Sequence, residues 1–123
     1  MADQEEQRSV VQEARAHARF VRIAPRKVRV VVDLIRGRAA EEAMATLRYT
    51  PKRASRLVYR VLRSAVANAE ENLDWRRADL VVSRAVVDNG PTLKRIHPRQ
   101  RGRAFDIKKH MAHVTVCVRP KEL

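Results

Sequence analysis

Several residue types are scarce in this sequence, and each shortage excludes a class of protein. A single cysteine, Cys117, excludes an internal disulfide framework. The three glycines are isolated from one another, so there is no glycine-rich loop to hold a nucleotide. Aromatic residues make up only 4% of the chain. That shortage argues against binders that stack unpaired bases on aromatic rings, and it leaves Val, Leu, Ile and Ala to form the core.

Long apolar segments are also missing. No run approaches the roughly 20 residues of a membrane-spanning helix. Neither a secretory signal nor a basic transit peptide is visible at the start. We therefore expect a cytoplasmic protein that has no membrane partner.

Negative charge is the last shortage, and it points to the kind of partner. The chain has 14 Asp and Glu residues and 27 Lys and Arg residues, so its net charge is +13. Such self-repulsion does not help a domain to fold, whereas a nucleic acid would neutralise it through phosphate contacts. Residues 1–13 are the exception, because they hold four acids and one base. We predict a mobile acidic tail over 1–13 and a single domain over 14–123.

Alternating apolar residues predict three strands in this domain. In residues 14–23, three alanines and Phe20 alternate with basic residues and a histidine. We expect a half-buried strand there, with Phe20 in the core and a bulge near Val21, where the alternation slips. Residues 80–87 and 114–118 are rich in valine and predict two further strands.

Apolar residues spaced three and four apart predict three helices. Pro25 suits a first helical position and Gly37 suits the residue after a last one, so we expect a helix over 25–36. The same spacing predicts helices over 40–49 and 51–73. The third helix carries a stripe of four arginines, namely Arg53, Arg56, Arg60 and Arg63.

The segment that joins the second and third strands is the most informative. Residues 89–103 read NGPTLKRIHPRQRGR, with five basic residues, no acid, two glycines and two prolines. This segment has too little apolar surface to order itself as a domain. We predict an extended hairpin over 88–104, with arms of about seven residues that reach about 23 Å at 3.3 Å per residue. RNA would order it.

No catalytic or metal-binding constellation is apparent. The spacing of His110, His113 and Cys117 suits one face of a helix, but this stretch predicts a strand, where those side chains do not converge. A fourth metal ligand is also missing. We expect the histidines to face RNA or solvent, Cys117 to pack as a small hydrophobic residue and Trp75 to anchor the packing of a loop. The sequence therefore predicts no enzyme, no metal and no cofactor.

Two other functional classes remain open at this point. A basic architectural protein that coats DNA would bind duplex DNA as tightly as folded RNA, although no helix-turn-helix pattern is visible. An RNA-modifying enzyme would need a cofactor site or a catalytic constellation.

Four segments of the sequence occur, in the same order, in one known family. They are IAPRKVRVVVDLIRG (23–37), SAVANAEEN (64–72), VDNGPTLKRIHPRQRGRA (87–104) and HVTV (113–116). Over about residues 14–118 the chain therefore resembles the bacterial-type large-subunit ribosomal protein twenty-two family.

This resemblance implies both a fold and a function. The implied fold is α+β, with three helices packed on a small, about three-stranded antiparallel sheet and a long protruding basic β-hairpin. The implied protein is a structural constituent of the large subunit of the cytoplasmic ribosome. It binds large-subunit (23S-type) rRNA at several RNA domains, supports early subunit assembly and lines the nascent-peptide exit tunnel with its hairpin. Its partners are that rRNA, neighbouring large-subunit proteins and the nascent polypeptide, and no homo-oligomer is expected.

We predict rRNA contacts at basic residues dispersed over the first strand, the helices and the hairpin, because dispersion suits many phosphate contacts on folded RNA. They are Arg15, Arg19, Arg22, Arg26, Lys27, Lys52, Arg53, Arg56, Lys94, Arg95, Arg99, Arg101, Arg103, Lys108 and Lys109. By position, the resemblance places the tunnel-lining hairpin tip at Thr92, Leu93, Lys94, Arg95, Ile96 and His97.

Overall fold

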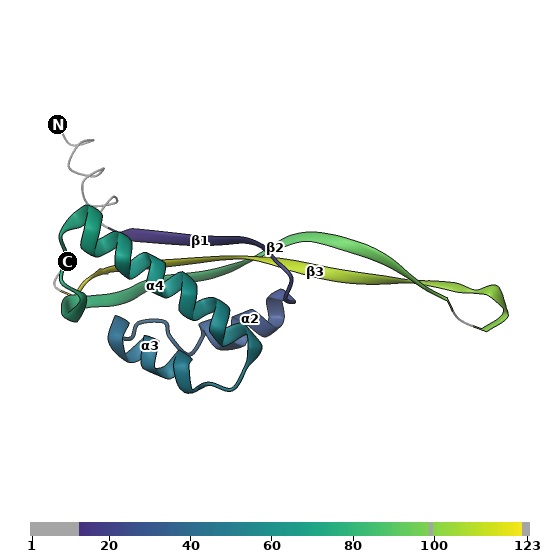
Figure 1. Ribbon diagram of the computed structural model, residues 1–123, viewed down its shortest axis with the longest axis horizontal. Helices are drawn as coiled ribbons and strands as arrows, with labels where there is room; N and C mark the ends of the chain where they lie inside the picture. The colour runs from purple at the N-terminus through teal and green to yellow at the C-terminus, as the bar shows by residue number, and fades with distance from the viewer. Residues whose placement is uncertain (1–12, 99, 122–123) are drawn as a thin grey trace.

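The computed structural model describes residues 13–98 and 100–121 of the chain. Within these residues, a three-stranded antiparallel sheet packs against three α-helices, and two of its strands extend far beyond the body (Figure 1). The predicted α+β fold is confirmed. The prediction of a tail over residues 1–12 lies outside the described residues. In chain order the elements are β1 (Ala14–Val21), α2 (Pro25–Val32), α3 (Ala40–Tyr49), α4 (Arg53–Leu73), a 3-10 turn (Arg77–Asp79), β2 (Leu80–Pro98), a second 3-10 turn (Gln100–Gly102) and β3 (Ala104–Pro120).

The sheet has the strand order β1-β3-β2, so β3 lies in the centre and is antiparallel to both neighbours. Val116 of β3 pairs with Ala16 of β1 on one side and with Ala85 of β2 on the other. The predicted strands 80–87 and 114–118 are the body halves of β2 and β3. Both strands continue beyond the body as a long hairpin, which accounts for their length.

The core lies between one face of the sheet and the apolar faces of the helices. Val58 and Leu62 of α4 and Val116 of β3 are fully buried there. Burial of an aliphatic side chain of this size contributes about 1.5–3 kcal/mol. The buried hydrophobic residues of the described part are Ala, Val, Leu and Ile, together with Cys117, as the shortage of aromatics predicted. Trp75 is half-buried against this core, which confirms its expected packing role.

Helix α2 ends at Val32, so the prediction that it continues to Arg36 is wrong. From Leu34 on, the N–H groups bond back three residues instead of four, as Ile35 N does to Val32 O at 3.1 Å, and the chain tightens into a turn. Gly37 has a φ of +74° and donates its N–H to Val82 O at 3.0 Å. This turn brings the chain to β2, while Ile35 keeps its predicted buried place. Helix α4 likewise begins at Arg53 rather than at residue 51.

Phe20 is 60% exposed, so the prediction that it belongs to the core is wrong. The β1–β3 register shifts between Ala18 and Val21, and Phe20 has a φ of +57° within that irregularity. The bulge turns the ring away from the core and onto His113, whose ring centroid lies 5.0 Å away in an edge-to-face contact. The Phe20 N–H donates to His113 Nδ1 at 3.1 Å. The interruption of the apolar alternation at Val21 predicted the bulge, but it did not predict the direction in which the Phe20 ring points.

The finger is the stretch of β2 and β3 that begins beside the end of β1, where Val21 still pairs with Ala112, and continues as a two-stranded ribbon to the turn. Its ladder runs from the pair Asp88–His113 to the pair Pro98–Ala104. The finger therefore spans residues 88–113, and the predicted range 88–104 covers only one arm and the turn. From Ala112, the last residue that pairs with β1, to Ala104 the β3 arm reaches about 27 Å at 3.4 Å per residue, slightly beyond the predicted 23 Å.

Candidate nucleic-acid interface

Basic side chains cover both faces of the finger. Lys94 and Lys108 are directly opposite each other on one face, whereas Arg95 and Lys109 lie on the other. All four are exposed, and like charges placed directly across a ladder destabilise it. Between residues 88 and 113 there are seven Lys and Arg residues and two acids, Asp88 and Asp106. A polyanion that lies along the finger would relieve this repulsion.

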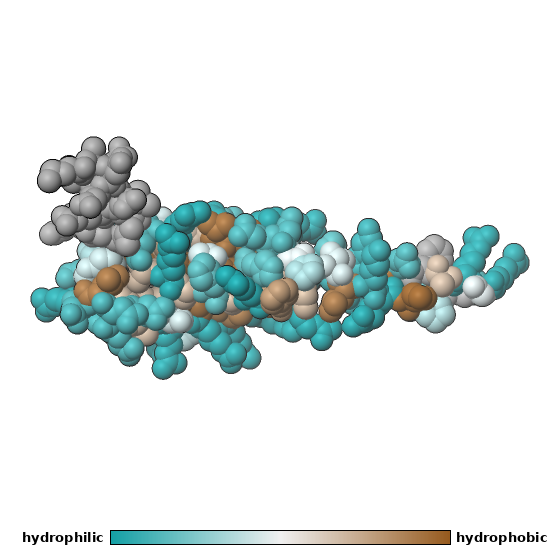
Figure 2. All heavy atoms as spheres, turned by 90° about the horizontal axis from the view of Figure 1, so that it is seen from above, coloured by the Kyte–Doolittle hydropathy of each residue, from teal (hydrophilic) through white to brown (hydrophobic). Residues whose placement is uncertain are grey.

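The sheet face opposite the helices forms a second basic surface. Arg15 on β1 and Arg84 on β2 both pair with Cys117 of the central strand, so they flank it on the same face. His17 continues this face, and its Nδ1 lies 2.9 Å from Thr115 Oγ1. Figure 2 views the molecule from the side of β1 and shows hydrophilic side chains from the body to the far end of the finger, with apolar residues as small separate spots.

Cys117 lies beneath this surface and is only 1% exposed. Burial raises the pKa of its thiol above the ordinary value, and the nearby Glu13 carboxylate raises it further. The expected role of Cys117 as a small packing residue is confirmed. Glu13 itself, which we had predicted to be in the tail, accepts a hydrogen bond from Ser83 Oγ at 3.0 Å, so it is attached to the body.

A third basic surface lies where the turn after β1 meets the start of α4. Arg22, Lys27, Lys52 and Arg53 line one hollow there, and none of its lining residues is acidic. Arg26 is exposed in the first turn of α2. The fold therefore brings together basic residues from separate elements that are up to about thirty positions apart in the chain.

Arg99, one of the predicted rRNA-contacting residues, lies outside the described residues. The other fourteen are exposed. The ion pairs in the described part of the chain are Arg36–Asp33, Arg38–Glu42 and Arg77–Glu70, and none of the fourteen takes part in them.

The predicted position of the hairpin tip is wrong. Residues 92–97 lie along the β2 arm and pair with residues 105–110 of β3. The chain reverses between Pro98 and Ala104, where Arg101 and Gly102 both have positive φ. Leu93 is half-buried on the arm, whereas Ile96 is 72% exposed. The tip that leads the finger is therefore the turn around residues 100–102.

Several exposed basic residues were missed by the site prediction. Arg84 is exposed because Ser83 and Arg84 together occupy a β-bulge, where the register shifts after Val82. Arg48, Arg60 and Arg63 line a hollow between α3 and α4. The arginine stripe of the third helix was the signal that could have found the last two.

The described residues contain neither a cluster of metal-ligating side chains nor a helix that could span a membrane. Nowhere in residues 13–98 and 100–121 do three or more His, Cys, Asp and Glu side chains come together as a metal site would require. His110 lies on the finger, and its Nδ1 is 3.5 Å from Thr92 Oγ1. His113 accepts a hydrogen bond from the Phe20 N–H through its Nδ1. No helix in this part of the chain combines the length and the apolarity needed to cross a membrane.

A small aliphatic body whose exposed cations have few acidic partners, and which extends a basic finger into solvent, defines a structural nucleic-acid-binding protein. Comparison with known proteins agrees with this class. Residues 16–119 match the family described as "Ribosomal protein L22p/L17e". This chain belongs to that family of ribosomal proteins, and it is not an enzyme.

Three relatives show how close the similarity is. The "Large ribosomal subunit protein uL22" of Thermoanaerobacter sp. (strain X514) is 56% identical over 110 residues, which are 89% of this chain and 99% of the relative. The protein of the same name from Pelotomaculum thermopropionicum is 56% identical over 89% of this chain and 97% of its own length. That from Desulforamulus reducens is 54% identical, with the same coverage of both chains.

Proposed function

We propose that this chain is a structural constituent of the large ribosomal subunit in the cytoplasm, where it binds large-subunit rRNA. The observation that carries the proposal is the finger, because its ribbon and turn hold six exposed basic residues among the described residues, outside the core of the body. The basic sheet face and the hollow beside α4 extend the charge over three sides of the molecule. Charge on several sides suits contact with several RNA domains at once, and hence a role early in subunit assembly.

The finger is the part that would line the nascent-peptide exit tunnel. Residues 92–97, which we predicted for this role, supply one side of the arm, and the turn at 100–102 leads it. A photo-crosslinking aromatic amino acid in place of Ile96, in ribosomes stalled on a radiolabelled nascent chain, should produce a crosslink to that chain. The same substitution at Arg76, on the body, should produce none. A nascent-chain crosslink from residue 76 but not from residue 96 would contradict the tunnel proposal.

The other proposed partners follow from the same placement. Neighbouring large-subunit proteins would contact the parts of the body that RNA does not cover. No second copy of the chain is required, and we expect the purified protein to sediment as a monomer.

Binding of the purified chain to three nucleic acids tests the rRNA proposal directly. They are matched large-subunit rRNA, small-subunit rRNA and duplex DNA, each titrated between 50 and 200 mM salt. With about six to ten phosphate contacts, the affinity should fall on the order of 10³–10⁵-fold over that range. A preference for large-subunit rRNA that persists at the higher salt supports a shaped RNA site. Equal affinity for all three would instead favour a protein that coats DNA or any other polyanion.

A further inference from the structure

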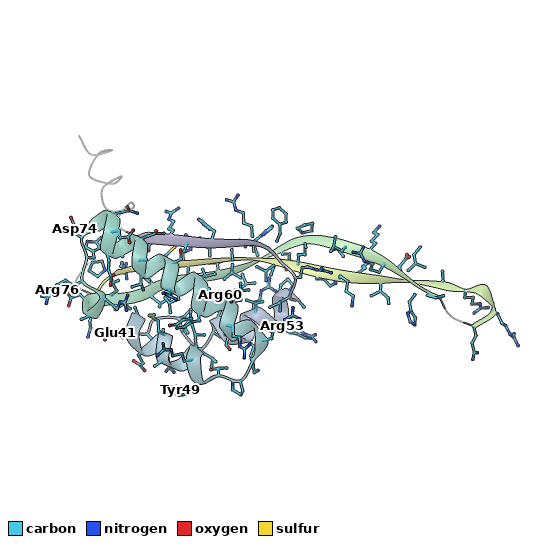
Figure 3. The ribbon with its side chains drawn as sticks, in the orientation of Figure 1. Glu41, Tyr49, Arg53, Arg60, Asp74 and Arg76 are labelled. Carbon is cyan, nitrogen blue, oxygen red and sulfur yellow. The ribbon has the colours of Figure 1, made fainter. Side chains whose placement is uncertain are left out.

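The hollow between α3 and α4 is a basic surface separate from the finger and from the basic sheet face. We call it the α3–α4 groove. It lies between the end of α3 and the first half of α4, on the helical side of the body (Figure 3). Six of its lining residues are basic and none is acidic. They are Arg48, Lys52, Arg53, Arg56, Arg60 and Arg63.

The floor of the groove is held in a fixed shape by its own hydrogen bonds. Thr50 Oγ1 donates to Thr46 O at 2.7 Å, which ties the end of α3 to the turn. Ser55 Oγ, which is buried, donates to Thr50 O at 2.8 Å, which ties the same turn to α4. Pro51 fixes one φ between them. The groove is therefore formed before any ligand binds.

Both tyrosines of the chain belong to this groove. Tyr59 is half-buried, and the Arg48 guanidinium carbon lies 5.8 Å from its ring centroid, a distance typical of a cation–π contact. Tyr49 is 86% exposed at the rim, at the last position of α3. An exposed aromatic ring beside several guanidinium groups is the arrangement by which proteins stack an unpaired base and hold its phosphates.

The positive charge does not stop at the end of the groove. Lys52 and Arg53 also line the neighbouring hollow, together with Arg22 and Lys27. The two hollows thus share lining residues and form one basic track around the start of α4. A strand of RNA could follow this track while the finger lies against other RNA.

We propose that the α3–α4 groove binds a looped-out, single-stranded segment of large-subunit rRNA, with one unpaired base stacked on Tyr49 and its flanking phosphates held by Arg56 and Arg60. The inference rests on the proposed function and names the form of RNA that this surface takes. A duplex presents its phosphates but buries the faces of its bases, so it would leave the Tyr49 ring unused. An acidic segment of a neighbouring protein would use the cations but not the ring.

Site-specific crosslinking in assembled large subunits tests the proposal. A photo-crosslinking aromatic amino acid replaces Tyr49 in one variant and Lys108, on the finger, in another. We expect the Tyr49 variant to crosslink to rRNA at an unpaired nucleotide, distinct from the nucleotides reached from position 108. A crosslink to rRNA from 108 only, or from 49 to a protein or to a base-paired nucleotide, overturns the groove assignment alone. No rRNA crosslink from either position would overturn the proposed function as well.

Affinity measurements separate stacking from charge. Tyr49→Ala should lower the affinity of the full chain for large-subunit rRNA about tenfold, and Tyr49→Phe should restore it, because the ring and not the hydroxyl stacks on the base. The double variant Arg56→Glu/Arg60→Glu should lower the salt dependence by about two phosphate contacts. The control pair Arg76→Glu/Arg119→Glu has the same charge change outside the groove and should not alter the effect of Tyr49→Ala. Unchanged affinity in Tyr49→Ala, with the fold verified by circular dichroism, would overturn the stacking contact.

Discussion

Cys117 shows how a residue's surroundings set its chemistry. Its side chain is buried below a face of arginines, yet burial and the Glu13 carboxylate dominate and raise the pKa of the thiol. Thiolate is the reactive form, and little of it is present near neutral pH when the pKa is raised. We expect iodoacetamide to alkylate native Cys117 at pH 8 at least tenfold more slowly than Cys117 of the urea-unfolded chain, as measured by mass spectrometry. Equal rates would contradict this environment.

The same shift has a consequence for stability. Because the unfolded thiol loses its proton at a lower pH than the folded thiol, rising pH above the ordinary thiol pKa favours the unfolded state. Replacement of Cys117 by Ala should remove that part of the alkaline destabilisation. The substitution should also cost some stability at every pH, since it leaves a small cavity.

Gly37 is a second position where one residue governs the path of the chain. Its φ is +74°, and no heavy atom lies within 4 Å of where a Cβ would be. A larger residue at this position would therefore be opposed by backbone strain and not by lack of space. Gly37→Ala should therefore lower the free energy of unfolding by about 1–2 kcal/mol, the usual cost of a left-handed L-residue. Urea denaturation measures this change. Arg38→Ala, next in the chain with no positive φ, is the matched control and should have a much smaller effect.

At the scale of elements, the finger is built against its own stability. Lys94 and Lys108 are directly opposite each other on the ladder, and both side chains are exposed. Lys94→Glu replaces the repulsion by a cross-strand ion pair worth a few tenths of a kcal/mol to about 1 kcal/mol. We expect finger amides of the free variant to exchange hydrogen more slowly, and its rRNA affinity to fall. If the protection of the amides and the rRNA affinity both increased, the finger would not contact phosphate at this position.

The body elements were predictable from the sequence, and the finger was less so. Helix 40–49 and the buried alternation of Ala14 and Ala16 were predicted correctly, because a helix or strand with one buried face carries a periodic apolar pattern. A two-stranded ribbon has water on both faces, so no such pattern marks where its arms end. Its turn uses Arg101 and Gly102 at positive φ, later in the chain than residues 92–97, where the resemblance had placed the tip.

The candidate interface divides in the same way. Exposed basic residues on elements with a clear outer face, such as Arg15 and Arg19, were found from the sequence. Arg84 was missed because a bulge exposes it. The α3–α4 groove was missed because it depends on how two helices lie against each other, which no single helix reveals.

At the scale of the whole molecule, like charge opposes the compact state. The net charge is +13, and the ion pairs of the described residues are three surface pairs, each worth little. We expect the melting temperature of the free protein to rise by several degrees between 10 and 150 mM KCl, because salt shortens the range of the repulsion from about 30 Å to about 8 Å. Differential scanning calorimetry measures it. A melting temperature that falls with salt would show that attractive pairs dominate.

The strands β2 and β3 that form the finger are also the strands clamped in the middle of the buried sheet. In mechanical terms the finger is a cantilever, and its tip moves only as its clamp moves. Over a lever of about 27 Å, a tilt of 10° at the root would carry the tip about 5 Å sideways, about the spacing of two neighbouring strands. Residues that seat the body, far from the tip, therefore aim it, and a substitution there could misdirect the finger without touching any residue of the finger itself.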